Sequence, residues 1–433
     1  MTHDWLKPAL QAVDIDDEGR ACKDIPESAC REETGNIFRH VVSLSLSKTA
    51  DGLIDPKLVL SWLMTHLGAP VALVGFLVPI RESGALLPQL FTAGALRALP
   101  KRKWAWAAGS TVQGLSALVI CLAALFLTGL TAGLVILGAL AVLATARSVC
   151  SVCYKDVLGK TVDKSHRGTA TGLAGSISAV GVIVFGVLLS TGWIERELLV
   201  TVGLGIAGLA WLVASLNFTG LKEEPGASEG GKAAISAAFE NLSLLKTEPQ
   251  LRRFILVRGL LTGTALAPPF MIAAGAGEGA DGYGGLGFLL LASAFASLVS
   301  GTVWGVLSDR SSRMVLILSA VSGAIALALT VGLSVLGYLS VPFVLPVVLF
   351  GLMIAYQGVR LGRSTHLVDM ANEETRAAFT ALSNTVIGVL LLLGSGFSAL
   401  AALTGPVSVI GVMAVMCALA GYFALGLDEV QTD

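Results

Sequence analysis

Charged side chains inside long apolar stretches are the residues of this sequence best able to do chemistry. Lys48, Asp51 and Asp55 are spaced at i, i+3 and i+7, which places them on one face of a helix. Arg81 and Glu82 adjoin one another near the middle of the next apolar stretch. A charge in a membrane costs about 3 kcal/mol on insertion scales unless it faces water or a partner. We therefore interpret these residues as a site for a polar or ionic solute.

The same site could take up a proton through Asp51 or Glu82. Asp51 is the first choice, because Lys48 lies one turn away on the same face. The alternative is structural. Lys48 and Asp51 would neutralise one another, as would Arg81 and Glu82, and the residues from Asp55 to Lys57 would already form a loop.

Two further arginines interrupt apolar stretches. Arg147 lies deep in the fourth stretch, where a guanidinium could bind a carboxylate or phosphate in a bidentate manner or extend toward the headgroups. Arg258 lies about one turn inside the seventh stretch, and we expect its side chain to extend to the headgroup layer.

Polar residues of the second half form a weaker pattern. Tyr356, Gln357 and Arg360 cluster in the tenth stretch, and Asn384 and Thr385 lie in the eleventh. These side chains could line a cavity or bond one helix to another.

Metal and redox chemistry find little support in the sequence. Cys150 and Cys153 form a C-x-x-C pair, but zinc needs two more ligands, so two buried thiols are the simpler interpretation. We expect His366, four residues before Met370, to be solvated at a loop edge. We expect no structural disulfide, no cofactor and no enzyme activity, because no nucleophile, metalloprotease or phosphate-binding motif occurs.

The elements that must position these residues are apolar helices. Hydrophobic residues make up 54% of the 433 residues and charged residues 14%, against about 25% charged in soluble domains. The net charge of −1 argues against nucleic-acid binding. Stretches of about 20 residues match the length of a membrane-spanning helix and exceed that of a barrel strand. The predicted spans are about 37–63, 70–97, 104–127, 131–154, 168–190, 198–218, 254–275, 285–307, 314–337, 341–362, 379–403 and 405–427.

These spans predict an all-α membrane protein of about twelve helices in two six-helix bundles. Basic loops such as Lys101–Lys103 fall on one side, which predicts a cell (inner) membrane protein with both termini in the cytoplasm. An acid followed by an arginine opens the fifth and eleventh spans, at Asp156 and Arg167 and again at Asp369 and Arg376. The predicted parts are an N-terminal tail (1–36), a first bundle (37–218), a cytoplasmic linker with a short amphipathic helix at 233–246 (219–253), a second bundle (254–427) and a tail (428–433).

One loop motif resembles that of a known family. Residues 305–313, reading GVLSDRSSR, are similar to the G-x-x-x-D-[RK]-x-G-[RK] loop of the major facilitator superfamily, with Ser312 in place of the second glycine. The equivalent stretch of the first half, residues 94–103, keeps the glycine and the terminal cations but has Ala98 in place of the aspartate. By this resemblance Asp309, Arg310 and Arg313 form a gating loop.

The resemblance covers residues 37–427 and implies two pseudo-symmetric bundles and secondary transport by alternating access. The expected partners are a small-molecule or ion substrate, the lipid bilayer and protons. A different function remains open, in which the chain keeps the fold but acts as a membrane sensor or assembly factor without transport. The direction of transport and the identity of the substrate do not follow from the sequence.

Overall fold

The computed structural model describes residues 27–89, 92, 96, 98–225, 244–278, 285–371 and 375–431. Within these ranges the side chains of Glu27, Ser165, Thr302, Asp309, Arg376 and Ala377 are left undescribed. The predictions for the tail before residue 27, for Gly94 and Arg97, and for the amphipathic helix up to residue 243 therefore lie outside the described residues.

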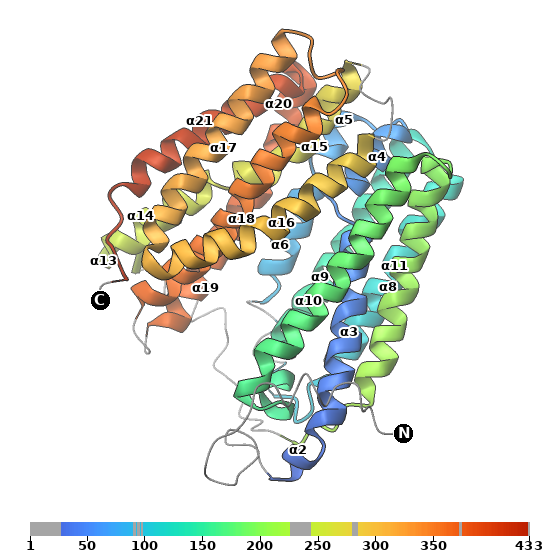
Figure 1. Cartoon of the computed structure of the whole chain (residues 1–433), viewed down its shortest axis with the longest axis vertical. Helices are drawn as coiled ribbons and strands as arrows, with labels where there is room; N and C mark the ends of the chain where they lie inside the picture. The colour runs from blue at the N-terminus through green and yellow to red at the C-terminus, as the bar shows by residue number, and fades with distance from the viewer. Residues whose placement is uncertain are drawn as a thin grey trace.

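Every regular element in these ranges is an α-helix (Figure 1). The first half contains α2 (Glu27–Arg31), α3 (Glu33–Leu53), α4 (Val59–His66), α5 (Val71–Val74), α6 (Leu77–Leu86), α8 (Lys103–Phe126), α9 (Gly129–Thr161), α10 (Lys164–Thr191) and α11 (Arg196–Thr219). The second half contains α13 (Leu244–Thr247), α14 (Pro249–Leu260), α15 (Gly263–Gly277), α16 (Gly285–Arg310), α17 (Ser312–Val335), α18 (Val344–Met370), α19 (Arg376–Leu393), α20 (Gly396–Thr404) and α21 (Pro406–Ala424).

Most predicted spans correspond to helices that could cross a membrane. Among the described residues, nine helical segments are long and apolar enough, and Gly285–Gly301 is a shorter apolar helix. The first predicted span is divided between α3 and α4, and the second between α5 and α6. The membrane helical fold is thus established, and the count of twelve spans stays a prediction.

The break between α3 and α4 has a local cause. One carboxylate oxygen of Asp55 accepts hydrogen bonds from the backbone N–H groups of Lys57 at 2.8 Å and Leu58 at 3.0 Å. Pro56, between Asp55 and Lys57, has no backbone N–H and cannot donate the hydrogen bond that would continue a helix. Asp55 is therefore the cap of a turn, which agrees with the loop interpretation for residues 55–57.

The two halves lie side by side and approach most closely at one end. In Figure 1 the blue-to-green half and the yellow-to-red half converge near α4, α5, α15 and α20, and they diverge toward the end that carries α2 and α13. Contacts between halves mark the same region: Gly186 of α10 lies against Gly287 of α16, and Gly75 lies against Phe270 and Ser398. We call this end the closed end and the other the terminal face.

The terminal face is organised alike in both halves. In the first half, the buried carboxylate of Glu223 accepts from the backbone N–H groups of Arg102 at 3.0 Å and Lys103 at 2.8 Å, at the start of α8. In the second half, the Gln431 side-chain oxygen accepts from the N–H of Ser312 at 2.8 Å, at the start of α17.

The predicted repeat of acids falls within these two networks. Asp156 near the end of α9 pairs with Arg102 and, at 2.7 Å, with Lys160. Asp369 at the end of α18 accepts from the side-chain amide of Gln431 at 2.6 Å. In each half, the segment after the last helix thus joins the start of one helix (α8 or α17) to the end of the helix that follows it (α9 or α18). This shared arrangement supports the pseudo-symmetry.

Candidate functional site

Asp51 lies at the centre of a charge cluster in the first half. Its carboxylate on α3 accepts from the Arg81 guanidinium of α6 at 2.7 Å and from the Arg147 guanidinium of α9. Lys48, the expected partner, extends instead to α10, where its ammonium donates to the backbone oxygen of Thr171 at 3.4 Å. The structure therefore brings together three of the predicted residues, with pairings that differ from the predicted ones.

The basic partner of Glu82 is Lys57, a residue that the sequence indicated only as part of a loop. The Lys57 ammonium lies 3.7 Å from a Glu82 carboxylate oxygen, and Lys57 is buried. The same ammonium lies 3.6 Å from the centre of the Tyr356 ring on α18. Lys57 thus joins the two halves by a cation–π contact. The available signal was a lysine directly after Asp55 and Pro56, at a break between two apolar helices.

Arg258 contradicts the expectation that it extends to the headgroup layer. Only 6% of its surface is exposed, and its guanidinium donates to the Ser383 hydroxyl at 2.7 Å and the Asn384 side-chain oxygen at 3.0 Å. The bend between α14 and α15 at residues 261–262 follows directly after this turn. Because α19 offers two polar acceptors at this depth, the arginine is held inside the bundle.

A small cavity of about 30 Å³ lies where Glu82 of the first half meets α15, α18 and α19 of the second half. Glu82 of the first half lines it together with Thr262, Tyr356, Arg360 and Arg363 of the second half. Gln357 is half-buried on the same helix but does not line this cavity. The cavity therefore has acidic and basic groups from opposite halves at its wall, and these groups can separate when the halves move.

The gating-loop residues lie at the terminal face. Arg310 is the exposed last residue of α16, and Arg313 lies half-buried in the first turn of α17. The side chain of Asp309 lies outside the described part of the structure. Between α16 and α17, the Ser311 hydroxyl bonds the Glu429 carboxylate at 2.7 Å. The gating role of the loop stays a prediction.

The remaining candidates are structural. His366 is 1% exposed, shares a hydrogen bond of 2.9 Å with the Ser312 hydroxyl and stacks on Phe254, so the expectation of a solvated histidine is wrong. Cys150 and Cys153 are buried free thiols. Within the described ranges, no group of three His, Cys, Asp or Glu side chains could hold a metal ion.

Cys30 is disulfide-bonded, contrary to expectation. The expectation of no structural disulfide is therefore wrong. The other described cysteines are free.

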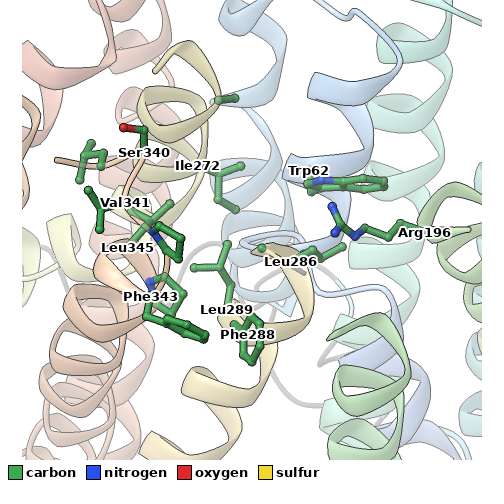
Figure 2. A pocket seen from close by; sticks show the side chains of 15 residues that line it. Trp62, Arg196, Ile272, Leu286, Phe288, Leu289, Ser340, Val341, Phe343 and Leu345 are labelled. Carbon is green, nitrogen blue, oxygen red and sulfur yellow. The ribbon is translucent and has the colours of Figure 1, made fainter. Parts of the chain in front are cut away.

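A second pocket lies at the closed end, between the halves. Trp62 and Arg196 of the first half face Ile272, Leu286 and Phe343 of the second half across it (Figure 2). Its lining is largely apolar, so contact between the halves at this end depends mainly on packing of hydrophobic side chains.

No protein-family model matches the sequence, and no curated protein sequence matches it. Solved structures match over nearly the whole chain. The nucleoside transporter NupG aligns with a TM-score of 0.67 at 13% identity, covering 90% of this chain and 98% of that chain. A D-xylose-proton symporter aligns with a TM-score of 0.66 at 12% identity, covering 92% and 99% respectively. Identities this low establish a shared fold, and this chain therefore has the same fold as these two transporters.

Proposed function

We propose that this protein is a secondary transporter that moves a small polar or charged solute across the cell membrane by alternating access. This proposal is based on the observation that charged and aromatic side chains of both halves meet at one site. Lys57 of the first half lies over the Tyr356 ring of the second half, and Glu82 shares a cavity with Arg360 and Arg363. A site built from both halves changes its shape whenever the halves rock against each other.

The packing of the halves supports a conformation open toward the terminal face. The close contacts between α10 and α16 lie in the part of each helix nearest the closed end. The Arg147 and Glu82 side chains keep 37% and 32% of their surface exposed, although both lie in the middle of their bundle. With the terminal face in the cytoplasm, as the basic loops predict, this conformation faces inward.

The similar structures agree with transport of a small solute. One is of a nucleoside transporter and the other of a D-xylose-proton symporter. We propose proton coupling here as well, with Glu82 ahead of Asp51 as the proton carrier. Two guanidiniums bind the Asp51 carboxylate, one to each oxygen, whereas Glu82 has a single ammonium at 3.7 Å and lines the cavity. A proton or a solute can therefore displace the partner of Glu82 more easily.

The test uses purified protein in proteoliposomes with a pH-sensitive dye trapped inside. Sugars, nucleosides and small organic anions are added outside, and solute-dependent proton movement is recorded. Glu82→Gln should abolish transport driven by a pH gradient and leave exchange of labelled for unlabelled solute largely intact, because exchange needs no net proton transfer. Asp51→Asn is measured in parallel.

Glu248→Gln is the matched control, because this carboxylate is exposed outside the bundle. It should behave as wild type. Unchanged gradient-driven transport in both Glu82→Gln and Asp51→Asn would show that these carboxylates are structural. A protein that binds a solute but neither accumulates nor exchanges it would favour the sensor function instead.

A further inference from the structure

Four basic side chains near the cavity beside Glu82 lack an acidic partner. Among the described residues, no carboxylate oxygen lies within 4.0 Å of a side-chain nitrogen of Lys48, Arg258, Arg360 or Arg363. Arg360 and Arg363 line the cavity directly. Arg258 lies one turn before Thr262, which lines the same cavity, and Lys48 lies one turn before Asp51 on α3.

The carboxylates near the cavity do not neutralise all of the basic side chains there. The Asp51 carboxylate forms ion pairs with two arginines, and the Glu82 carboxylate forms an ion pair with one lysine. Asp55 caps a turn and belongs to the same region. Seven basic side chains thus face three carboxylates, which leaves four positive charges uncompensated. The basic residues are Lys48, Lys57, Arg81, Arg147, Arg258, Arg360 and Arg363.

Lipid headgroups do not neutralise the charge of Arg258, because its side chain is held inside the bundle. The residue is buried, its bonding partners Ser383 and Asn384 are neutral, and its Nε has no hydrogen-bond partner. A buried guanidinium without a counter-charge is costly, because its desolvation is not repaid. An anion that entered the cavity would supply the missing charge.

We propose that the transported solute is an anion that carries a carboxylate or phosphate group, bound by Arg360 and Arg363 with Arg258 behind them. This inference rests on the proposed transport function and narrows its substrate class. The planar fork of each arginine matches both oxyanion groups, and two or three such groups can hold one anion from several sides. Glu82 lies at the edge of the same cavity, where it repels the anion when ionised and releases Lys57 when protonated. Proton uptake at Glu82 would therefore favour anion binding.

The first test measures the charge of the cavity without any solute. Thr262→Cys and Ala265→Cys each place a thiol in the cavity lining, and Thr404→Cys places one at the exposed closed end, all in a chain whose native cysteines are replaced. Each variant reacts with two methanethiosulfonate reagents, one anionic and one cationic. The anionic-to-cationic rate ratio at the cavity thiols should exceed that at Thr404→Cys by about tenfold, the scale of one or two poorly screened charges.

Matched variants identify the source of this ratio. Arg360→Gln with Arg363→Gln should bring it close to the value at Thr404→Cys. Arg252→Gln, an exposed cation two turns before Arg258 on α14, should leave it unchanged. A cavity ratio no higher than at Thr404→Cys, or one that persists in the double variant, overturns the proposal.

The second test asks whether anions occupy the cavity. Succinate against succinamide, and glucose 6-phosphate against glucose, are compared at equal ionic strength for slowing of Thr262→Cys labelling. At least one anion should protect several-fold more than its neutral partner, and Arg258→Gln should weaken that protection while Arg252→Gln does not. If no anion protects better than its partner, or neutral solutes protect better, the proposal is wrong.

Lipid phosphate is the other source of the same chemistry. Labelling in nanodiscs of neutral lipid and of anionic lipid separates the two, because a free solute should protect in both. Protection by anionic lipid alone would overturn the proposal for a solute. Neither test requires transport, so a protein that binds an anion in the cavity but moves nothing would confirm the anion site and refute the proposed transport function. A transporter with a neutral cavity would do the reverse.

Discussion

Gly287 controls the approach of the two halves at the closed end. A Cβ atom placed on Gly287 of α16 would lie 2.7 Å from the backbone oxygen of Gly186 and 2.8 Å from the backbone carbon of Leu189, both on α10. Backbone atoms cannot rotate out of the way as a side chain could. The backbone nitrogen of Ser190 would lie closer still. Because ordinary contacts begin near 3.4 Å, Gly287→Ala should push α10 and α16 apart by roughly 1 Å.

The expected cost of this overpacking is about 1–3 kcal/mol. It applies only while the halves are in contact at the closed end, whereas the helix propensity gained from alanine acts in every conformation. The variant should therefore shift the equilibrium away from this conformation by about 5- to 150-fold. Spin labels at Trp193→Cys and Tyr338→Cys, exposed positions of opposite halves at this end, measure the shift as a population of longer distances.

Gly301→Ala is the control, because a Cβ atom at this exposed position of the same helix would meet nothing within 4 Å. Its distance distribution should match that of the wild type. A wild-type distribution for Gly287→Ala, or an equal shift for Gly301→Ala, would refute the reasoning that this crossing holds the closed end together.

Three further predictions concern residues outside this crossing. Glu223→Ala removes the acceptor of two backbone N–H groups at the start of α8 and should lower stability by about 1–3 kcal/mol in thermal unfolding, whereas the exposed neighbour Glu224→Ala should not. Lys57→Met and Tyr356→Leu should show a coupling of about 0.5–2 kcal/mol in a double-mutant cycle, and strictly additive effects would contradict the contact between halves. Asp309→Asn should slow transport while substrate affinity stays within a few-fold, and a collapse of affinity at unchanged rate would refute the gating role.

The positions of the helices were largely predictable from the sequence. The predicted span 104–127 is α8 at 103–126, and the predicted span 198–218 is α11 at 196–219. Such agreement is expected, because a segment in a bilayer must be apolar and must satisfy its own backbone hydrogen bonds. The break after α3 was also readable, from Asp55 and Pro56.

The sequence predicted which residues belong to the candidate site but not how they pair. Asp51, Arg81, Glu82 and Arg147 stand out because charge is costly in an apolar span. Their pairings did not follow, because Arg81 reaches Asp51 only through the packing of α6 against α3. Arg258 and His366 were misjudged for the same reason: the depth of a residue along its own helix does not reveal which polar groups a neighbouring helix presents.

A membrane bundle in two halves, and the set of charges that it must accommodate, follow from the amino-acid sequence alone, because both depend on composition and on short-range spacing. Which cation meets which carboxylate depends on helix packing, which also brings Glu82, Tyr356, Arg360 and Arg363 to one cavity from segments about 270 residues apart. The physical reason is that helix rotation and crossing in a bundle follow from packing of small residues such as Gly186 and Gly287, and this packing depends on both partners at once.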